Sequence, residues 1–339
     1  GHTGTEKRST QRSTQTDTHC TRPKVHKISM MLIVTRREIF AAAAFAAPSV
    51  APPALAPSAQ PAVRLTDGSS LPFISFGTQI YDDDTAYQLT SKALEAGFRS
   101  FFASIESGNQ RGFARAIRDS RLPREELFIS GSVLSDAAAG YRNSYRETQR
   151  GVLSNMENMA AGGIGKLDLL LLEYPGNNPP SIRGQWRGLD EARDAGLVSS
   201  LGVSNFDVDQ LDIILADGRA RSAPQVNQLP LSLAFRMPYP ELIEAHIQRG
   251  VALQAWSPLG GPEQLISPSI MAECVAMGGP LRKSGAQVAL RWLVQNGIAI
   301  TVHSRSAAHL RDDARLFDFS LTAAQMARLD ELAVSLRVA

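Results

Sequence analysis

Short apolar runs alternate with amphipathic stretches from residue 63 almost to the end of the chain. Brief apolar runs between turn residues predict β-strands. The first two, at residues 63–65 and 71–74, flank Asp67-Gly68, a dipeptide typical of a hairpin turn. After this hairpin we expect strands at residues 74–78, 99–103, 127–133, 167–173, 200–204, 225–228, 252–257 and 298–303.

The stretches between these strands carry apolar residues at helical spacing, which predicts helices with one buried face. We expect helices at residues 85–96, 112–120, 145–160, 182–195, 208–216, 239–249, 286–295 and 322–332. Residues 169–172 are four consecutive leucines, as in a parallel strand that is covered on both faces. Strand and helix repeat eight times, so the sequence predicts an α/β fold, a (β/α)8 TIM barrel behind an N-terminal β-hairpin.

Enzymes with this fold place their active sites where the barrel strands end. The rule directs attention to residues at the predicted carboxyl ends of the strands. These residues are Phe102, Ser132, Glu173, Ser204, Asn205, Gln228, Trp256 and His303.

Residues 1–59 differ in composition from the barrel at residues 60–339. Residues 1–29 are rich in Ser, Thr, Lys and Arg, and the first methionines are Met30 and Met31. This composition is typical of a disordered or transit-type segment. A tag or a translated leader explains the opening stretch equally well.

A twin-arginine (Tat) export signal is the next feature. Arg36-Arg37 precedes an Ala-rich run at residues 41–47, and small residues at 54–56 or near Ala59 suit cleavage. A transit segment followed by a Tat signal predicts the chloroplast thylakoid lumen, whereas a Tat signal alone predicts a bacterial periplasm. The alternative is a chance arginine pair in a disordered tail.

Residues 1–59 and residues 60–339 also differ in net charge. Residues 1–59 hold eight of the 35 Lys and Arg and three of the 33 Asp and Glu, which leaves the barrel a net charge of about −3. A slightly acidic surface gives no reason to expect nucleic acid as a partner. The apolar run is too short to span a bilayer. Without residues 1–59 only Cys274 remains, so no intramolecular disulfide is expected, and we expect this cysteine to be packed on a helix.

Five segments of the barrel resemble signatures of the aldo-keto reductases. They are GFR at 97–99 with GN at 108–109, LGVSNF at 201–206, QVNQ at 225–228, WSPLG at 256–260 and AQVALRW at 286–292. The segments follow the family's order, and the resemblance covers residues 62–333. It implies a barrel that binds NADP(H) without a Rossmann fold.

The resemblance assigns nicotinamide contacts residue by residue. Ser204, Asn205 and Gln228 stand where the family holds the carboxamide, a group that needs both a donor and an acceptor. Trp256 stands where an aromatic ring stacks on the nicotinamide, and Ser257 and Leu259 stand beside the pyrophosphate. The alternative for Ser204 and Asn205 is a cap for the following helix.

The family's 2′-phosphate segment corresponds to residues 303–313. Its two cationic positions are His303 and His309 here, with Ser304 and Arg305 next to the first. Histidine is mostly neutral near pH 7, whereas the Arg305 guanidinium is suited to bind phosphate. We expect NADP with a weakened 2′-phosphate site rather than NAD. Solvated surface histidines are the alternative.

The resemblance also locates the family's four catalytic positions, and all four are changed. An ungapped alignment places Phe102 at the aspartate, Ser107 at the tyrosine, Ser132 at the lysine and Glu173 at the histidine. The family's tyrosine donates a proton while the lysine lowers its pKa. A serine hydroxyl is far less acidic than a phenol, so standard carbonyl reduction is expected to be weak or absent.

Glu173 is the one new titratable group at this centre, and an apolar mouth beside Phe102 should raise its pKa. Glu106 is a weaker candidate, expected to be a solvated loop charge. Tyr174 should point to the opposite face, because neighbouring strand residues alternate. Two interpretations follow. The chain is an NADP(H)-binding oxidoreductase with a replaced proton donor, or a non-catalytic barrel that binds a protein partner or aids assembly.

Overall fold

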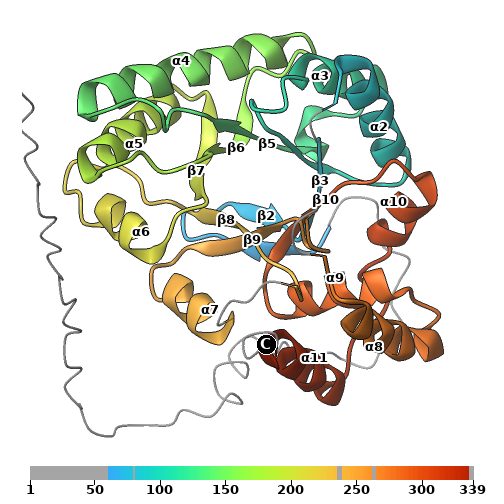
Figure 1. The fold of residues 1–339 in the computed structure, drawn as a ribbon. Coiled ribbons are helices and arrows are strands. Elements are labelled where there is room, and N and C mark those ends of the chain that lie inside the picture. Colours follow the sequence, from blue (N-terminus) through green and yellow to red (C-terminus); the bar gives the residue numbers. More distant parts are fainter. Residues whose placement is uncertain (1–59, 79–80, 235–238, 262–264, 336–339) are drawn as a thin grey trace, which may run out of the picture. The chain divides into compact units, whose positions relative to one another are not determined.

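The computed structural model describes residues 60–78, 81–234, 239–261 and 265–335. The predicted targeting segment at residues 1–59 lies outside this part of the chain. Eight parallel strands close into a barrel in the order β10-β3-β4-β5-β6-β7-β8-β9, as Figure 1 shows. The strands are β3 (Ile74–Gly77), β4 (Ser100–Ala103), β5 (Phe128–Val133), β6 (Leu167–Leu172), β7 (Val198–Ser204), β8 (Val226–Pro230), β9 (Ala252–Trp256) and β10 (Ala299–Val302). The predicted TIM barrel is confirmed.

Helices surround the barrel on its outside (Figure 1). They are α2 (Asp83–Glu95), α3 (Gln110–Ser120), α4 (Tyr141–Ala160), α5 (Pro179–Asp194), α6 (Val208–Leu215), α7 (Tyr239–Ile247), α8 (Pro268–Gly278), α9 (Gly285–Gln295), α10 (Ala307–Ala314) and α11 (Ala323–Ser335), with short 3₁₀ turns η1 (Arg124–Glu126) and η2 (Gly279–Leu281). None of these helices is both long and apolar enough to cross a bilayer. Cys274 is buried on α8, as predicted.

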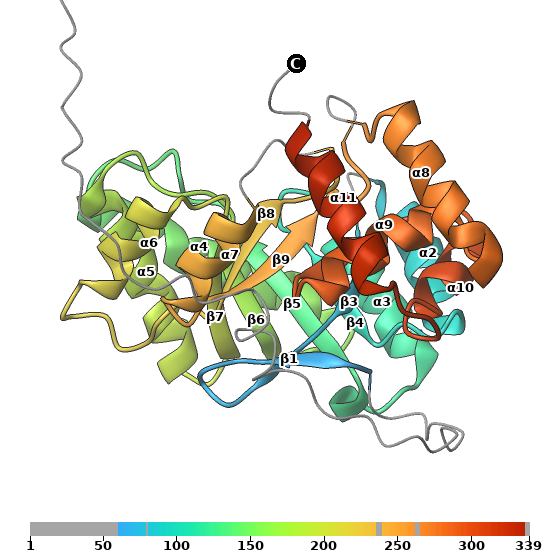
Figure 2. The same cartoon turned by 90° about the horizontal axis from the view of Figure 1, so that it is seen from below.

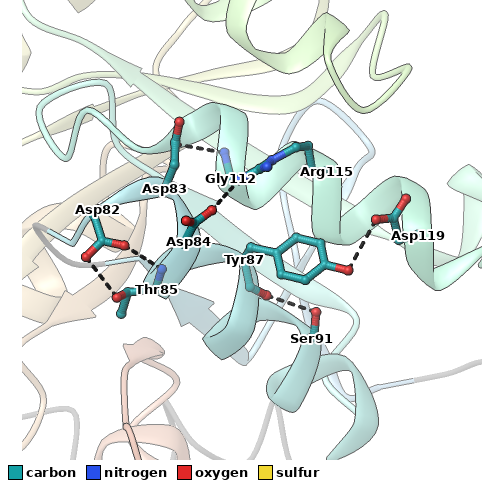
Figure 3. Close-up of polar contacts among 9 residues, drawn as sticks. All are labelled: Asp82, Asp83, Asp84, Thr85, Tyr87, Ser91, Gly112, Arg115 and Asp119. Carbon is teal, nitrogen blue, oxygen red and sulfur yellow. Dashed lines mark hydrogen bonds and ion pairs between the residues drawn. The ribbon is translucent and has the colours of Figure 1, made fainter.

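Helices α2 and α3 pack closely because Gly112 has no side chain. A Cβ at this position would lie 1.9 Å from the carbonyl oxygen of Asp83. The close approach lets the Gly112 amide donate to the Asp83 carboxylate at 2.8 Å (Figure 3). Arg115 pairs with Asp84 at 3.0 Å and lies over the ring of Tyr87. These contacts hold α3 against α2, and α3 follows the loop that carries Ser104 and Ser107.

Apolar side chains form two cores. The larger one lies between the sheet and the helices and contains Trp186 and Trp292. The smaller one includes Phe102, Leu169, Leu171 and Ala299, together with hairpin residues. Phe102 therefore packs in this smaller core with residues of β6 and β10.

The hairpin of β1 (Ala62–Arg64) and β2 (Ser70–Pro72) lies across one end of the barrel, as Figure 2 shows. Its turn is bonded to the starts of two strands: Ser200 donates to Asp67 at 2.7 Å, and the Asp67 amide donates to Gln225 at 2.8 Å. These contacts lie at the amino ends of β7 and β8. The opposite end, where the strands finish, remains as the mouth of the barrel.

Three details differ from the sequence predictions. Helices α8 and α10 were not expected, because neither has a strongly one-sided apolar pattern. Strand β6 ends at Leu172, and the next two residues form a bend. Strand alternation therefore stops before Tyr174, and the prediction that this side chain points away toward packing is wrong: it lines the cavity at the mouth.

Candidate active site

A cavity of about 180 Å³ opens at the carboxyl ends of the strands. It is lined by Thr78, Phe102, Ser104, Glu106, Ser107, Glu173, Tyr174, Ser204, Asn205, Gln228 and Trp256. We call this the mouth cavity. The residues from β4, β6 and their following loops (Phe102, Ser104, Glu106, Ser107, Glu173 and Tyr174) form its carboxyl wall. The residues from β7, β8 and β9 (Ser204, Asn205, Gln228 and Trp256) form its amide wall.

Glu173 is the centre of a short hydrogen-bond chain. Ser104 Oγ donates to Glu173 Oε2 at 3.1 Å, and Ser132 Oγ donates to Ser104 Oγ at 3.1 Å. The amides of Glu106 and Ile105 complete the chain by donating to these two hydroxyls. Ser132 is fully buried behind Ser104 and does not reach the cavity surface. Ser132 therefore acts on the Glu173 carboxyl indirectly, through the Ser104 hydroxyl.

Burial raises the pKa of Glu173, as the sequence predicted, and the charge of Glu106 raises it further. The hydrogen bond from Ser104, which Ser132 supports, opposes this shift because it stabilises the carboxylate. Burial likewise raises the pKa of Tyr174, and the nearby Glu106 and Glu173 add to the effect. Among the described residues, no lysine lines the cavity to lower either pKa.

Phe102 and Ser107 fill the remaining part of the carboxyl wall. Phe102 is 8% exposed at the end of β4, where it pairs in register with Ser130. Ser107 Oγ donates to the carbonyl oxygen of Thr78 at 3.2 Å. The Thr78 hydroxyl itself is buried and has no hydrogen-bond partner within the described part of the chain. A buried polar atom without a hydrogen bond destabilises the folded protein until a ligand or a water molecule bonds to it.

The amide wall is a connected set of polar side chains. Asn205 Nδ2 donates to the carbonyl oxygen of Glu173 at 2.9 Å and to Ser204 Oγ at 3.2 Å. Gln228 Nε2 donates to Gln254 Oε1 at 2.9 Å. Asn205 has a left-handed backbone with φ of 62°, which asparagine tolerates better than most residues. The wall therefore offers amide groups that are already held in place.

Trp256 covers one side of this wall. Its indole Nε1 donates to Asn205 Oδ1 at 3.1 Å, and Trp256 is 36% exposed. The other two tryptophans, Trp186 and Trp292, are fully buried. An exposed ring with a fixed orientation is suited to stack against a flat ligand.

The residues expected to follow the cofactor outward do not line the mouth cavity. Ser257 and Leu259 are half-buried after β9, and Ser304 lies in the turn before α10. His303, Arg305 and His309 are exposed, and desolvation by the surrounding protein still lowers the pKa of His303. The Arg305 guanidinium lies 5.0 Å from the centre of the Tyr81 ring. His303, Ser304 and Arg305 precede α10 in the chain, and His309 lies in its first turn.

Sequence reasoning overlooked two residues of the site, Thr78 and Ser104. Neither belongs to a catalytic position of the family, so the alignment gave no reason to single them out. Ser104 could have been found from its place two residues after Phe102, at a predicted strand end. Glu106, expected to be a solvated loop charge, is exposed but also lines the cavity.

Comparison with known proteins bears on this arrangement. The sequence model of the aldo/keto reductase family matches residues 74–265 and 275–334, which is most of the barrel. The chain belongs to the aldo/keto reductase family. An aldo-keto reductase of Mycolicibacterium vanbaalenii is 32% identical over 275 residues, covering 81% of this chain and 93% of that protein. A glyoxal reductase of Bacillus subtilis is 29% identical over 276 residues, covering 81% of this chain and 94% of its own.

Solved structures of the aldo-keto reductases share this barrel. A Brucella melitensis aldo/keto reductase superposes with a TM-score of 0.71 at 27% identity, covering 81% of this chain and all of that one. A Bombyx mori aldo-keto reductase, solved in complex with NADP, gives the same TM-score at 23% identity, covering 80% of this chain and 92% of that one. Among the described residues no cluster of metal-ligating side chains is present. The chain therefore has the fold of a family of oxidoreductases.

Proposed function

We propose that this protein is an aldo-keto reductase-like oxidoreductase that binds NADP(H) but reduces carbonyls by the usual route weakly or not at all. The observation that carries the proposal is the contrast within the mouth cavity. Its amide wall keeps the residue types of the family, whereas its carboxyl wall contains neither a lysine nor a histidine.

The amide wall supports nicotinamide binding. Ser204, Asn205 and Gln228 would hold the carboxamide, and the exposed ring of Trp256 would stack on the nicotinamide face. When bound, NADPH supplies hydride. Solved structures of relatives include one with NADP.

The carboxyl wall argues against the usual proton transfer. Tyr174 is the only phenol on the cavity, and burial together with the two glutamates raises its pKa. A proton donor of this reaction needs the opposite shift. Glu173 is the remaining acid, and burial favours its protonated form. We assign any residual proton donation to Glu173, positioned by Ser104.

The 2′-phosphate contact would come from Arg305 with His303, Ser304 and His309, and Ser257 and Leu259 would border the pyrophosphate. Arginine keeps its charge at every physiological pH, so this set favours NADP over NAD with reduced affinity. A second candidate function is a non-catalytic barrel that serves a protein partner, in the thylakoid lumen or a periplasm if residues 1–59 direct export. The aligned residues Phe102, Ser107, Ser132 and Glu173, which differ from the family's four catalytic side chains, favour it.

Titration with NADPH tests the binding half of the proposal. Trp256 is the exposed tryptophan, so quenching of protein fluorescence on NADPH addition should disappear in Trp256→Phe. Calorimetry on the same variant would show whether binding itself persists. If wild-type protein binds neither NADPH nor NADH, the assignment of Ser204, Asn205 and Gln228 is wrong.

Steady-state turnover then separates the two functions. Glyoxal and other small dicarbonyls are suitable substrates, since relatives include a glyoxal reductase and a 2,5-diketo-D-gluconic acid reductase. Slow NADPH oxidation that Glu173→Gln abolishes supports the oxidoreductase. Binding of NADPH with no turnover of any dicarbonyl supports the non-catalytic alternative.

A further inference from the structure

The carboxyl wall of the mouth cavity has a one-sided charge. Glu106 and Glu173 both line it, and among the described residues no lysine, arginine or histidine does. The charges that act on Tyr174 are Glu106, Glu173 and Asp136, all negative. Within the same part of the chain, neither lining glutamate forms an ion pair with a cation. The described charges of this wall are therefore acidic.

Aromatic rings frame the same carboxylates. Phe102 and Tyr174 both belong to the carboxyl wall, and Tyr174 is 37% exposed. Aromatic faces attract weakly hydrated cations, and quaternary ammonium groups are commonly recognised by such rings. Glu106 adds direct charge attraction, and a bound cation favours the ionised form of Glu173 over the protonated form that burial favours in the free cavity.

A third feature is independent of charge. Thr78 is 4% exposed and lines the cavity beside Ser107, and among the described residues its hydroxyl has no hydrogen-bond partner. A buried hydroxyl can donate one hydrogen bond and accept others. It fits a ligand that carries a hydroxyl or carbonyl oxygen within a few bonds of its charged group.

We propose that the carboxyl wall of the mouth cavity binds a small organic cation, an ammonium compound with a neighbouring hydroxyl or carbonyl oxygen. Its ammonium group would lie against Glu173, Glu106 and Tyr174, and its oxygen near Thr78. The inference rests on the proposed function for the location of the nicotinamide, which would cover Trp256 and leave this wall free. The proposed substrates are cations, so this class excludes anionic sugar acids.

Calorimetric titration with choline tests the inference. The matched ligand is 3,3-dimethylbutan-1-ol, which has the same shape and hydroxyl group but no charge. We expect choline to bind about tenfold more tightly than the alcohol, the size of a desolvated cation on an aromatic and acidic surface. Equal affinities, or binding of neither compound, would overturn the inference.

Variants locate the bound cation. Glu173→Gln and Glu106→Gln should each weaken choline binding several-fold and leave the alcohol unaffected. Glu125→Gln is the matched control, because Glu125 is exposed in the 3₁₀ turn before β5, at the other end of the barrel. Choline affinity that does not change in either cavity variant would show that the cation binds elsewhere.

Nucleotide separates the two proposals. Choline titrated into protein saturated with NADPH should bind as it does to free protein, since the two ligands use opposite walls. Competition between them would contradict this placement of the cation. If NADPH does not bind but choline does, with the same variant pattern, the proposed function fails and the cation site stands.

Discussion

The two walls of the mouth cavity differ in the polar groups that they present. The amide wall on β7, β8 and β9 has a connected set of hydrogen bonds: Asn205 alone joins Ser204, Trp256 and the backbone of Glu173. The carboxyl wall on β4 and β6 presents two glutamates, a phenol and, among the described residues, no cation, and we propose that it lacks the family's usual proton donor. Binding and chemistry can therefore be altered separately on one scaffold, because different strands carry them.

The carboxyl wall is also consistent within itself. An aspartate at the position of Phe102 would be a buried charge without a lysine to pair with, at a cost of several kcal/mol. Phe102 removes that charge and packs with Leu169 and Leu171. Ser132, which the resemblance aligns with the lysine, joins the hydroxyl chain that ends at Glu173. On the proposed alignment the four residues are therefore consistent with one another.

The largest expected effect comes from rebuilding the family's carboxyl wall. The variant Phe102→Asp, Ser107→Tyr, Ser132→Lys and Glu173→His should raise the rate of aldehyde-dependent NADPH oxidation by ~10²-fold or more, since general-acid catalysis contributes 10²–10⁴-fold. The control carries Ser107→Phe in place of Ser107→Tyr and should stay at the wild-type rate. Equal rates in the two variants would show that the ungapped assignment is wrong. Circular dichroism would confirm that both fold.

A smaller effect is expected on the amide wall. Trp256→Ala should weaken NADPH binding about tenfold, because it removes one stacking surface and leaves Asn205 Oδ1 without its donor. Calorimetry is the appropriate measurement, as the variant loses its fluorescent reporter. Ser107→Ala, on the carboxyl wall, should bind NADPH as wild type does. If Ser107→Ala weakened NADPH binding and Trp256→Ala did not, the assignment of the nucleotide to the amide wall would be wrong.

The phosphate segment should respond to pH by several-fold. Burial and Asp312 raise the pKa of Asp313 to about 7, so acidification below that value removes a negative charge from α10. Desolvation lowers the pKa of His303, so this imidazole gains its charge only towards the acid end of the range. The affinity for NADPH relative to NADH should therefore increase from pH 8 to pH 5.5. The change should be smaller in Asp313→Asn and smaller still when His303 is replaced by glutamine as well.

The smallest effect concerns stability. The folded state raises the pKa of Glu173 above its usual value of 4.5, so it binds a proton that the unfolded chain has released. Wild type should therefore lose unfolding free energy, relative to Glu173→Gln, as pH rises from 4.5 through the raised pKa. The loss scales at about 1.4 kcal/mol for each pKa unit. Denaturation at several pH values would measure it, and a pH-independent difference would contradict the burial of this carboxyl.

Much of this architecture could be predicted from the sequence. Strand positions followed from apolar runs such as residues 169–172, and eight of the cavity's lining residues were singled out from strand ends or motifs. The pKa shift of Glu173 followed from its apolar neighbours. These features depend on local pattern, which one sequence contains.

The remainder depends on where strands stop and how loops fold back. Tyr174 reaches the cavity because β6 ends at Leu172, two residues before it, so that strand alternation no longer sets its direction. Ser104 is hydrogen-bonded to Glu173, a residue 69 positions later in the chain. The place of Ser104 at a strand end could be read from the sequence, but its partner could not.

The most direct measurement is a single-turnover reaction of wild-type protein saturated with NADPH and mixed with glyoxal, followed by nicotinamide absorbance. The account predicts tight, saturable NADPH binding and oxidation far below one turnover per second, the lower end of ordinary enzyme rates. Oxidation at about one per second or faster would show that the carboxyl wall delivers a proton efficiently, and would contradict the account.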